Sequence, residues 1–287
     1  MSENMHLKDL YQYGKENMKR HLIENPALET SILLSKSSAI KDISEIYAHP
    51  EKELDQVKVD AFNRLMERRI KNEPIAYITG EKEFYSRTFS IERSVLIPRP
   101  ETELLAEETL RAADRMERPA ILDIGTGSGC IAVTLACELK DAKIYGADIS
   151  PEAIALAAKN ARRHGSRDKI LFVRGNLTDP FKKDAFDIVA SNPPYISERE
   201  FKTLPPEIKD FEPRSSLIAG EDGLYFIRQI ISGAAYILKN GGWCLLEIGA
   251  GQSSAVMTLF KAAGFTEIST SRDINDIERV VRARWRK

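Results

Sequence analysis

Apolar residues recur at the three- and four-residue spacing of a helix through the first part of the chain. Such runs cover residues 7–22, 28–34 and 57–70, and Asn25-Pro26 separates the first run from the second. The outward positions of the third run carry charged side chains. We therefore expect a small helical bundle over residues 1–80, which either caps the molecule or docks a macromolecular substrate.

Between residues 81 and 97 the hydrophobic pattern changes to a period of two, which is typical of extended chain. Alternate residues from Phe84 to Ile91 fall on opposite faces, and Arg93-Ser94 are expected to form a turn. The segment 81–97 therefore predicts a short hairpin or an extended linker.

From residue 98 to residue 287, short apolar strands alternate with longer helical patterns, after a first helix expected at 101–116. Strands are expected at 120–124, 143–148, 170–175, 186–190, 243–248, 265–270 and 278–284. Helices are expected at 129–139, 151–164, 222–238 and 252–263. This alternation predicts an α/β domain with a doubly wound, mostly parallel sheet. Ligands of such sheets bind beyond the carboxyl ends of the strands.

The charges of the chain nearly cancel, because 42 Lys and Arg face 43 Asp and Glu. Proteins that bind nucleic acid through its phosphates usually carry a clustered positive excess, and none is visible in these totals. The cysteines Cys130, Cys137 and Cys244 lack the spacing of zinc ligands, so we expect reduced thiols in the core and no metal. The polar start of the chain and the lack of a long apolar run favour a soluble cytoplasmic protein.

A glycine-rich turn follows the strand expected at 120–124. It reads Gly125-Thr126-Gly127-Ser128-Gly129 and leads into a helix whose free N–H groups can receive a polar ligand group. A tight turn without a ligand is the alternative. The spacing is GxGxG, and Cys130 takes the place of the last glycine of the GxGxxG dinucleotide fingerprint. This difference counts against a nicotinamide oxidoreductase.

Two further strand ends carry polar residues that could complete a nucleoside site. Asp148 ends the strand expected at 143–148, where a carboxylate can accept both ribose hydroxyls. Capping the next helix is the alternative for Asp148, but Ser150 suits that position better. Asn176 and Leu177 follow the third strand. There the amide oxygen of Asn176 can accept a hydrogen bond from the amino group of adenine, and the side chain of Leu177 can pack on the adenine ring. An ordinary loop position is the alternative for Asn176.

The fourth strand leads into Asn192-Pro193-Pro194-Tyr195. Two prolines fix the backbone and remove two donors, so the Asn192 side-chain oxygen and the Pro193 carbonyl remain as acceptors. An amide nitrogen is a poor nucleophile, and two acceptors on its N–H bonds would hold it and favour the positive charge that develops on attack. Tyr195 could pack on the flat amide. A proline-stiffened turn is the structural alternative.

These motifs resemble the PrmC/HemK family, in which the Asn-Pro-Pro-Tyr motif acts on an amide or amino nitrogen. The similarity extends to five further segments along the chain: residues 74–84, 97–103, 211–213, 222–224 and 246–249. It covers essentially the whole chain, including the helical part. Asn176 is one departure, because the family usually has an acid there.

The resemblance implies a class I methyltransferase fold with a seven-stranded sheet, S-adenosylmethionine as cofactor, and methylation of the N5 nitrogen of the glutamine in the Gly-Gly-Gln motif of class I release factors. Residues 125–129, Asp148, Leu177 and Asn192 would contact the cofactor, and Arg99 and Glu101 would shape that side. Asn192, Pro193, Pro194 and Tyr195 would hold the glutamine amide. Domains are then expected at 1–80, which would dock the release factor, at 81–97 as a hairpin linker, and at 98–287 as the methyltransferase. We expect a monomer without direct nucleic-acid or membrane contact.

Other assignments make different demands on the sequence. An adenine methyltransferase would need to flip a base out of its helix and hold a phosphate backbone, and the mixed charges of residues 1–80 do not suit that task. A binding module that has lost its chemistry would not need Asn192–Tyr195. The long segment 197–220 is expected either to wall the glutamine site or to be a surface loop.

Overall fold

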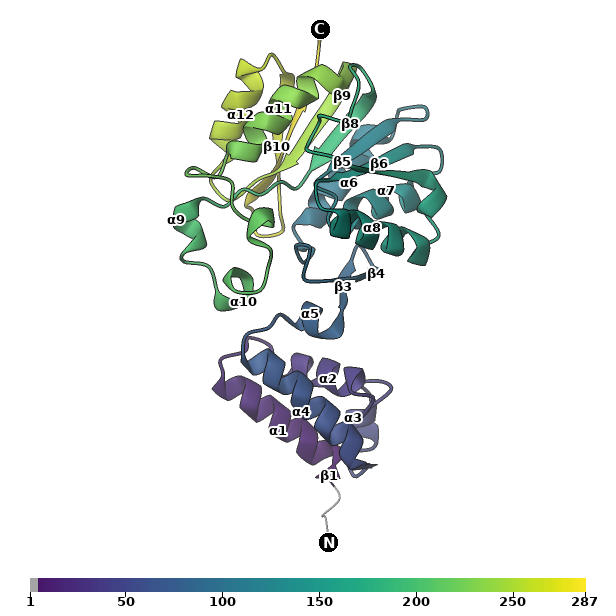
Figure 1. Ribbon diagram of the computed structural model, residues 1–287, viewed down its shortest axis with the longest axis vertical. Helices are drawn as coiled ribbons and strands as arrows, with labels where there is room; N and C mark the ends of the chain where they lie inside the picture. Colours follow the sequence, from purple (N-terminus) through teal and green to yellow (C-terminus); the bar gives the residue numbers. More distant parts are fainter. Residues whose placement is uncertain (1–4) are drawn as a thin grey trace. The chain divides into compact units, whose positions relative to one another are not determined.

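The computed structural model describes residues 5–287, and these form two compact units (Figure 1). The first unit extends to Gly80 and also includes Pro206–Phe211. Its elements are β1 (Met5–His6), α1 (Leu7–Arg20), α2 (Pro26–Lys36), α3 (Glu45–Ala48), β2 (Glu53–Leu54), α4 (Gln56–Ile70), α5 (Ile75–Thr79) and α10 (Pro206–Lys209). The three expected helices are therefore confirmed, and the two short helices α3 and α5 are additional.

The first unit is held by a core between α1, α2 and α4. Leu10, Leu33 and Phe62 are fully buried there. Gly14 allows α1 to approach closely, because a Cβ atom at this position would lie 2.7 Å from the Phe62 ring and 2.8 Å from the Thr30 methyl group. Burial of these apolar side chains is what stabilises helices that would be marginal in isolation.

The second unit begins with a hairpin of β3 (Glu81–Phe84) and β4 (Arg87–Ser90). The expected hairpin is present, and so is the turn expected at Arg93-Ser94, across which the Val95 N–H donates to the Glu92 carbonyl at 3.2 Å. The hairpin itself reverses at Tyr85-Ser86, where φ is +51° and +55°. Positive φ at both central positions matches the twist of a two-residue hairpin, and such conformations leave no strong mark in a sequence without glycine or asparagine.

The seven strands of the main sheet run in the order β10-β11-β9-β8-β5-β6-β7. Their bounds are β5 (Ala120–Ile124), β6 (Lys143–Asp148), β7 (Ile170–Arg174), β8 (Phe186–Ser191), β9 (Leu238–Glu247), β10 (Thr266–Arg272) and β11 (Glu278–Arg284). β5 to β9 are parallel to one another, and β11 is antiparallel to both of its neighbours. The expected doubly wound, mostly parallel seven-stranded sheet is confirmed.

Helices cover both faces of this sheet (Figure 1). On one face lie α6 (Thr102–Ala113), α7 (Cys130–Glu138) and α8 (Pro151–Arg163); on the other lie α11 (Tyr225–Ile237) and α12 (Ser253–Ala262). The first seven residues of α7 are buried, which explains why its sequence is apolar on every side. The segment between β8 and α11 contains α9 (Glu198–Phe201), α10 and the short 3₁₀ helix η2 (Arg214–Ser216).

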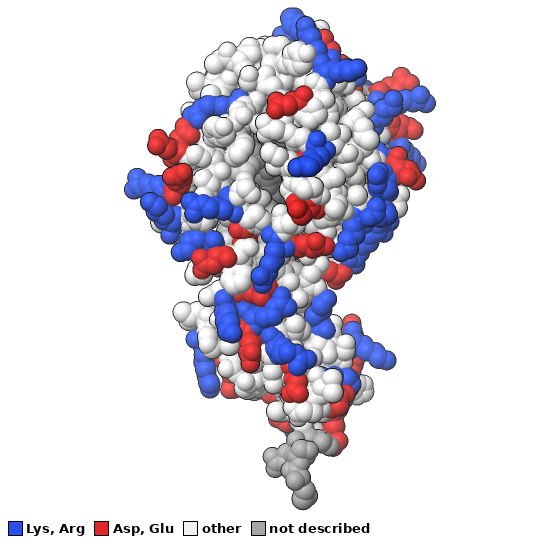
Figure 2. Space-filling model, viewed as in Figure 1, with Lys and Arg blue, Asp and Glu red and all other residues white. Residues whose placement is uncertain are grey.

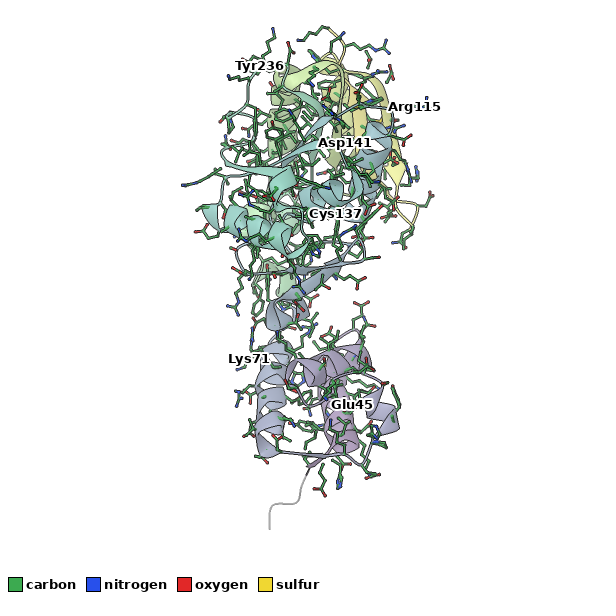
Figure 3. All side chains as sticks on the ribbon, turned by 90° about the vertical axis from the view of Figure 1, so that its right-hand side faces the viewer. Glu45, Lys71, Arg115, Cys137, Asp141 and Tyr236 are labelled. Carbon is green, nitrogen blue, oxygen red and sulfur yellow. The ribbon has the colours of Figure 1, made fainter. Side chains whose placement is uncertain are left out.

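The three thiols differ in their surroundings. Cys130 and Cys244 are buried and reduced, as expected for core cysteines. Cys137, seven residues along α7 and labelled in Figure 3, is only half-buried, because the end of that helix approaches the surface. None of the helices in the described part of the chain has the length and hydropathy that a membrane crossing needs.

Candidate active site

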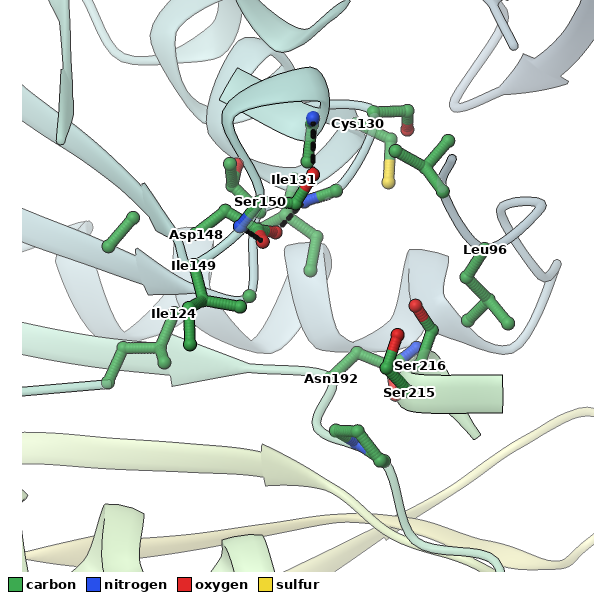
Figure 4. A pocket seen from close by; sticks show the side chains of 18 of the residues that line it. Leu96, Ile124, Cys130, Ile131, Asp148, Ile149, Ser150, Asn192, Ser215 and Ser216 are labelled. Carbon is green, nitrogen blue, oxygen red and sulfur yellow. Dashed lines mark hydrogen bonds between the residues drawn. The ribbon is translucent and has the colours of Figure 1, made fainter. Parts of the chain in front are cut away.

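A cavity of about 330 Å³ opens where the parallel strands of the second unit end (Figure 4). The loops after β5, β6, β7 and β8 all reach it. Its lining includes most of the site residues expected from the sequence, namely Gly125, Thr126, Gly127, Ser128, Asp148, Asn176, Leu177, Asn192 and Pro194. The carboxyl edge of the sheet is therefore the ligand-binding edge, as the fold class predicts.

The three glycines of the loop after β5 serve different purposes. Gly125 and Gly127 have φ of +71° and +54°, and a Cβ atom on Gly125 would meet no described atom within 4 Å. Gly129, with φ of +81°, is the N-cap of α7, and a Cβ atom there would lie 2.9 Å from the Cβ of Ala157 on α8. Gly129 therefore lets two helices approach, whereas the first two glycines shape the open side of the loop.

Asp123 braces this loop from inside the sheet, and the sequence patterns did not single it out. Its carboxylate accepts hydrogen bonds from the Thr126 hydroxyl at 2.7 Å and from the Ala132 N–H at 3.2 Å. Burial, with a smaller contribution from the nearby Asp148, raises the pKa of Asp123 to about 7. An acid inside an otherwise apolar strand was the available signal, because such a group needs partners that the fold must supply.

Asp148 lies at the end of β6 with its carboxylate beside the glycine loop (Figure 4). It accepts hydrogen bonds from the Gly127 N–H and the Ser150 N–H, both at 3.0 Å. Ser150 caps α8, since its hydroxyl accepts from the Ala153 N–H at 3.1 Å. The expectation that Ser150 rather than Asp148 is the helix cap is therefore confirmed.

Asn176 and Leu177 contribute the wall after β7. Asn176 is exposed, and its side-chain N–H donates to Asp179 at 3.1 Å. Leu177 has φ of +44°, an uncommon value for a branched side chain, and packs partly buried beside the cavity. The side-chain oxygen of Asn176 is the atom that could receive an amino proton.

The side-chain amide of Asn192 is oriented by Thr102. The Asn192 Nδ2 donates to the Thr102 hydroxyl at 3.0 Å. The Asn192 Oδ1 is buried and accepts no hydrogen bond from residues 5–287. A buried acceptor without a partner costs about 1–3 kcal/mol, and a ligand N–H would remove that cost. Asn192 therefore presents an unused acceptor at the edge of the cavity.

Pro193 and Tyr195 are not part of the cavity wall formed by the described residues. Pro193 is buried, and the Tyr195 hydroxyl lies 3.5 Å from the Glu247 Oε1. Burial and the Glu247 carboxylate raise the pKa of Tyr195, so the phenol stays neutral. The Gln252 side chain holds the Tyr195 carbonyl at 2.9 Å. The structure thus brings Asn192 and Pro194 to the cavity, whereas Pro193 and Tyr195 are not among the described residues that line it.

Two segments that lie more than 100 residues apart meet beside the cavity. Glu212 is buried and accepts from Arg99 at 2.5 Å and from the Ile97 N–H at 3.2 Å. This ion pair holds the start of α6 against the long segment between β8 and α11. Ser215 and Ser216, which follow Glu212, line the cavity. Part of the long segment therefore lines this cavity, and a role for it at a glutamine site stays a prediction.

Comparison with known proteins agrees with this geometry. Residues 100–205 match the methyltransferase small domain, and residues 9–80 match the PrmC N-terminal domain. A methyltransferase from Pyrococcus furiosus shares the fold, with a TM-score of 0.51 and 16% identity, covering 78% of this chain and 99% of that one. Sheet order, glycine loop and family match define the class: this is an S-adenosylmethionine-dependent methyltransferase.

The particular family follows from close relatives. A release factor glutamine methyltransferase from Geobacter sulfurreducens is 43% identical, with 91% of this chain and 90% of that protein covered. A protein of the same description from Nitratidesulfovibrio vulgaris is 38% identical, with 97% and 95% covered. The chain therefore belongs to the release factor glutamine methyltransferase family, and the resemblance noted in the sequence is confirmed.

Proposed function

We propose that this protein transfers the methyl group of S-adenosylmethionine to the N5 nitrogen of the glutamine in the Gly-Gly-Gln motif of class I release factors. The observation that carries the proposal is the unused Oδ1 acceptor of Asn192, held beside a nucleoside-sized cavity. The names of the relatives support the choice of glutamine over other nitrogen substrates.

The residues around the cavity fit this cofactor. S-adenosylmethionine, when bound, supplies an electrophilic methyl group on a sulfonium. The open turn at Gly125–Gly129 would admit its polar part near the start of α7. The Asp148 carboxylate would accept from the ribose hydroxyls, and Asn176 and Leu177 would contact the adenine. In this assignment Gly129 acts by allowing helix packing and need not touch the cofactor.

The amide nitrogen of glutamine would be held by acceptors. The Asn192 Oδ1 would accept a hydrogen bond from one N–H group of the glutamine amide. The Pro193 carbonyl would accept a hydrogen bond from the other N–H group. Both contacts become stronger as positive charge develops on the nitrogen, which is why they favour the transition state over the bound substrate. Pro194 would pack against the amide. Tyr195, whose hydroxyl faces Glu247, would support the motif from behind.

The helical residues 1–80 would dock the release factor, and 98–287 would carry out the reaction, with the hairpin segment 81–97 between them. Positive and negative side chains are interleaved over both units on the face shown in Figure 2. No large single-sign surface appears on that face, which suits a protein partner better than a phosphate backbone. We propose that the enzyme acts as a monomer.

Methyl transfer to purified substrates tests this function. Tritiated S-adenosylmethionine is incubated with the protein and a class I release factor, or with a variant whose Gly-Gly-Gln glutamine is replaced by alanine. We expect label in the first and none in the second, with a mass increase of one methyl group on the Gly-Gly-Gln peptide. Label in DNA or RNA instead would support an adenine methyltransferase. Cofactor binding without a single turnover would support a binding module.

A further inference from the structure

We propose that Thr102 is a positioning residue that determines which end of the Asn192 side-chain amide is available to the substrate. Thr102 is the first residue of α6, is only 2% exposed, and lies 90 positions before Asn192 in the sequence. It belongs to the segment 97–103 that resembles the family, but its position alone gives it no role in the site, since a threonine at a helix start is ordinarily a capping residue. This inference rests on the proposed function.

The Thr102 hydroxyl contacts one end of the Asn192 side-chain amide. The two ends of a side-chain amide are similar in shape and differ in hydrogen bonding, because the nitrogen donates and the oxygen accepts. In the structure the nitrogen faces Thr102, with 3.0 Å between Nδ2 and the hydroxyl oxygen. The oxygen is left for another donor. If the amide rotated by half a turn, it would present its nitrogen to the substrate. That nitrogen is a donor and could not accept a hydrogen bond from a substrate N–H group.

The proton of the Thr102 hydroxyl can be donated to one of two acceptors. A hydroxyl has one proton, and it could donate to the oxygen of a rotated Asn192 amide. That proton has a competing acceptor in the carboxyl group of Glu247, a buried residue of β9 whose pKa the Thr102 hydroxyl lowers, against the larger effect of burial. A threonine that donates to Glu247 offers only a lone pair to Asn192. The series from Glu247 through Thr102 to Asn192 therefore favours the observed orientation.

The orientation of the Asn192 amide affects the rate of methyl transfer. Asn192 is a useful acceptor only while its oxygen faces the substrate, so the fraction of molecules with that orientation scales the rate of methyl transfer. Valine has nearly the shape of threonine and lacks the hydroxyl. Thr102→Val should let both amide orientations occur and leave the Asn192 nitrogen without its partner. Thr102→Ser should keep the hydroxyl and the orientation.

The experiment compares these variants with a matched control on the same helix. Thr109 is also fully buried in α6, but its hydroxyl bonds the Leu105 carbonyl of its own helix at 2.7 Å. We expect Thr102→Val to lower kcat by at least tenfold with a KM for S-adenosylmethionine within about threefold of wild type. Thr102→Ser and Thr109→Val should each stay within about threefold in kcat. A Thr102→Val enzyme with near-normal kcat, or a serine variant as slow as the valine variant, would overturn the proposal.

A second measurement does not depend on turnover. The side-chain NH₂ signals of Asn192 can be recorded by ¹⁵N NMR and assigned by their loss in Asn192→Ala. We expect slow hydrogen exchange in the wild type and in Thr109→Val, and faster exchange in Thr102→Val. Unchanged exchange in Thr102→Val would overturn the positioning role even if release factors were not the substrate. Absence of methyl transfer by the wild type, with the exchange pattern as expected, would instead overturn the proposed function alone.

Discussion

Asn192 shows how much of the chemistry depends on one side chain. Its nitrogen has a partner within the protein, and its oxygen has none among residues 5–287. Buried polar atoms are nearly always paired, although Asn63 and Gln229 also have one buried amide atom without a partner in the described part of the chain. Of these three side chains, Asn192 is the one that lines the cavity. The unpaired oxygen is therefore best explained as a group kept for a ligand.

Asn192→Ala should abolish measurable methyl transfer, with a loss of at least about 100-fold in kcat, because removing one oriented group at a developing charge typically costs that much. The fold should remain, since the side chain makes one hydrogen bond to the protein. Single-turnover assays and thermal unfolding check both parts. Near-normal turnover would remove Asn192 from the mechanism.

Asp148→Ala should mainly weaken cofactor binding. The carboxylate lies in the cavity wall and also accepts from the Gly127 N–H, so its loss removes a ligand contact and loosens the glycine loop. Calorimetric titration with S-adenosylmethionine should show at least a tenfold higher Kd. Asp141→Ala, at an exposed position in the loop before β6 and labelled in Figure 3, serves as control and should bind normally. Equal affinities in the two variants would reassign Asp148 to a structural role.

At the scale of elements, the cavity lies where four parallel strands end at one edge of the sheet and α7 begins directly after the glycine loop. Gly129 makes this possible by letting α7 approach α8, and the Arg99–Glu212 ion pair ties the start of α6 to the segment that contributes Ser215 and Ser216. Packing between helices thus determines the shape of the site as much as the glycine loop does.

Gly129→Ala should destabilise the protein by about 2–4 kcal/mol. The alanine would have to adopt a positive φ, and its Cβ atom would lie 2.9 Å from the Cβ of Ala157. Gly165→Ala is a matched control. Its φ is +64°, but a Cβ atom there would meet no described atom within 4 Å, so only the backbone cost of about 1 kcal/mol is expected. Urea unfolding of the two variants measures the difference. Equal losses would show that the contact between α7 and α8 is not tight.

At the scale of the whole molecule, the second unit buries several carboxyl groups near its functional edge, and the pKa is raised in two of them, Asp123 and Glu247. Burial is the main cause that raises the pKa of both Asp123 and Glu247 to about 7. The unfolded chain loses these protons near pH 4, whereas the folded protein keeps them to about pH 7. Folding therefore takes up protons between these values, and this contribution reduces stability as the pH rises.

Glu247→Gln should remove part of this pH dependence. Relative to wild type, the variant should gain stability between pH 5 and pH 8, because its neutral side chain has no charge to bury. Thermal unfolding of both proteins across this range gives the difference in Tm at each pH. A difference in Tm that is constant with pH would contradict the assigned ionisation of Glu247.

Much of this protein could be predicted from local sequence. Periodicity located the helices of the first unit and the strands of the sheet, since apolar spacing reflects which faces are buried. The glycine turn, Asp148 and Asn192-Pro193-Pro194-Tyr195 were recognisable because each is a short motif with its own chemistry. The family also followed from such segments, and the relatives confirm it.

Only the tertiary structure determined the contacts between residues that lie far apart in the chain. Thr102 meets Asn192 across 90 positions, Arg99 meets Glu212 across 113, and residues 206–211 join the first unit. The turn at Tyr85-Ser86 and the separation of Tyr195 from the cavity wall likewise depend on surrounding packing. A local sequence pattern indicates which side of a helix or strand is buried. It does not indicate which groups of other elements pack against that side, and those groups determine the hydrogen-bond partners.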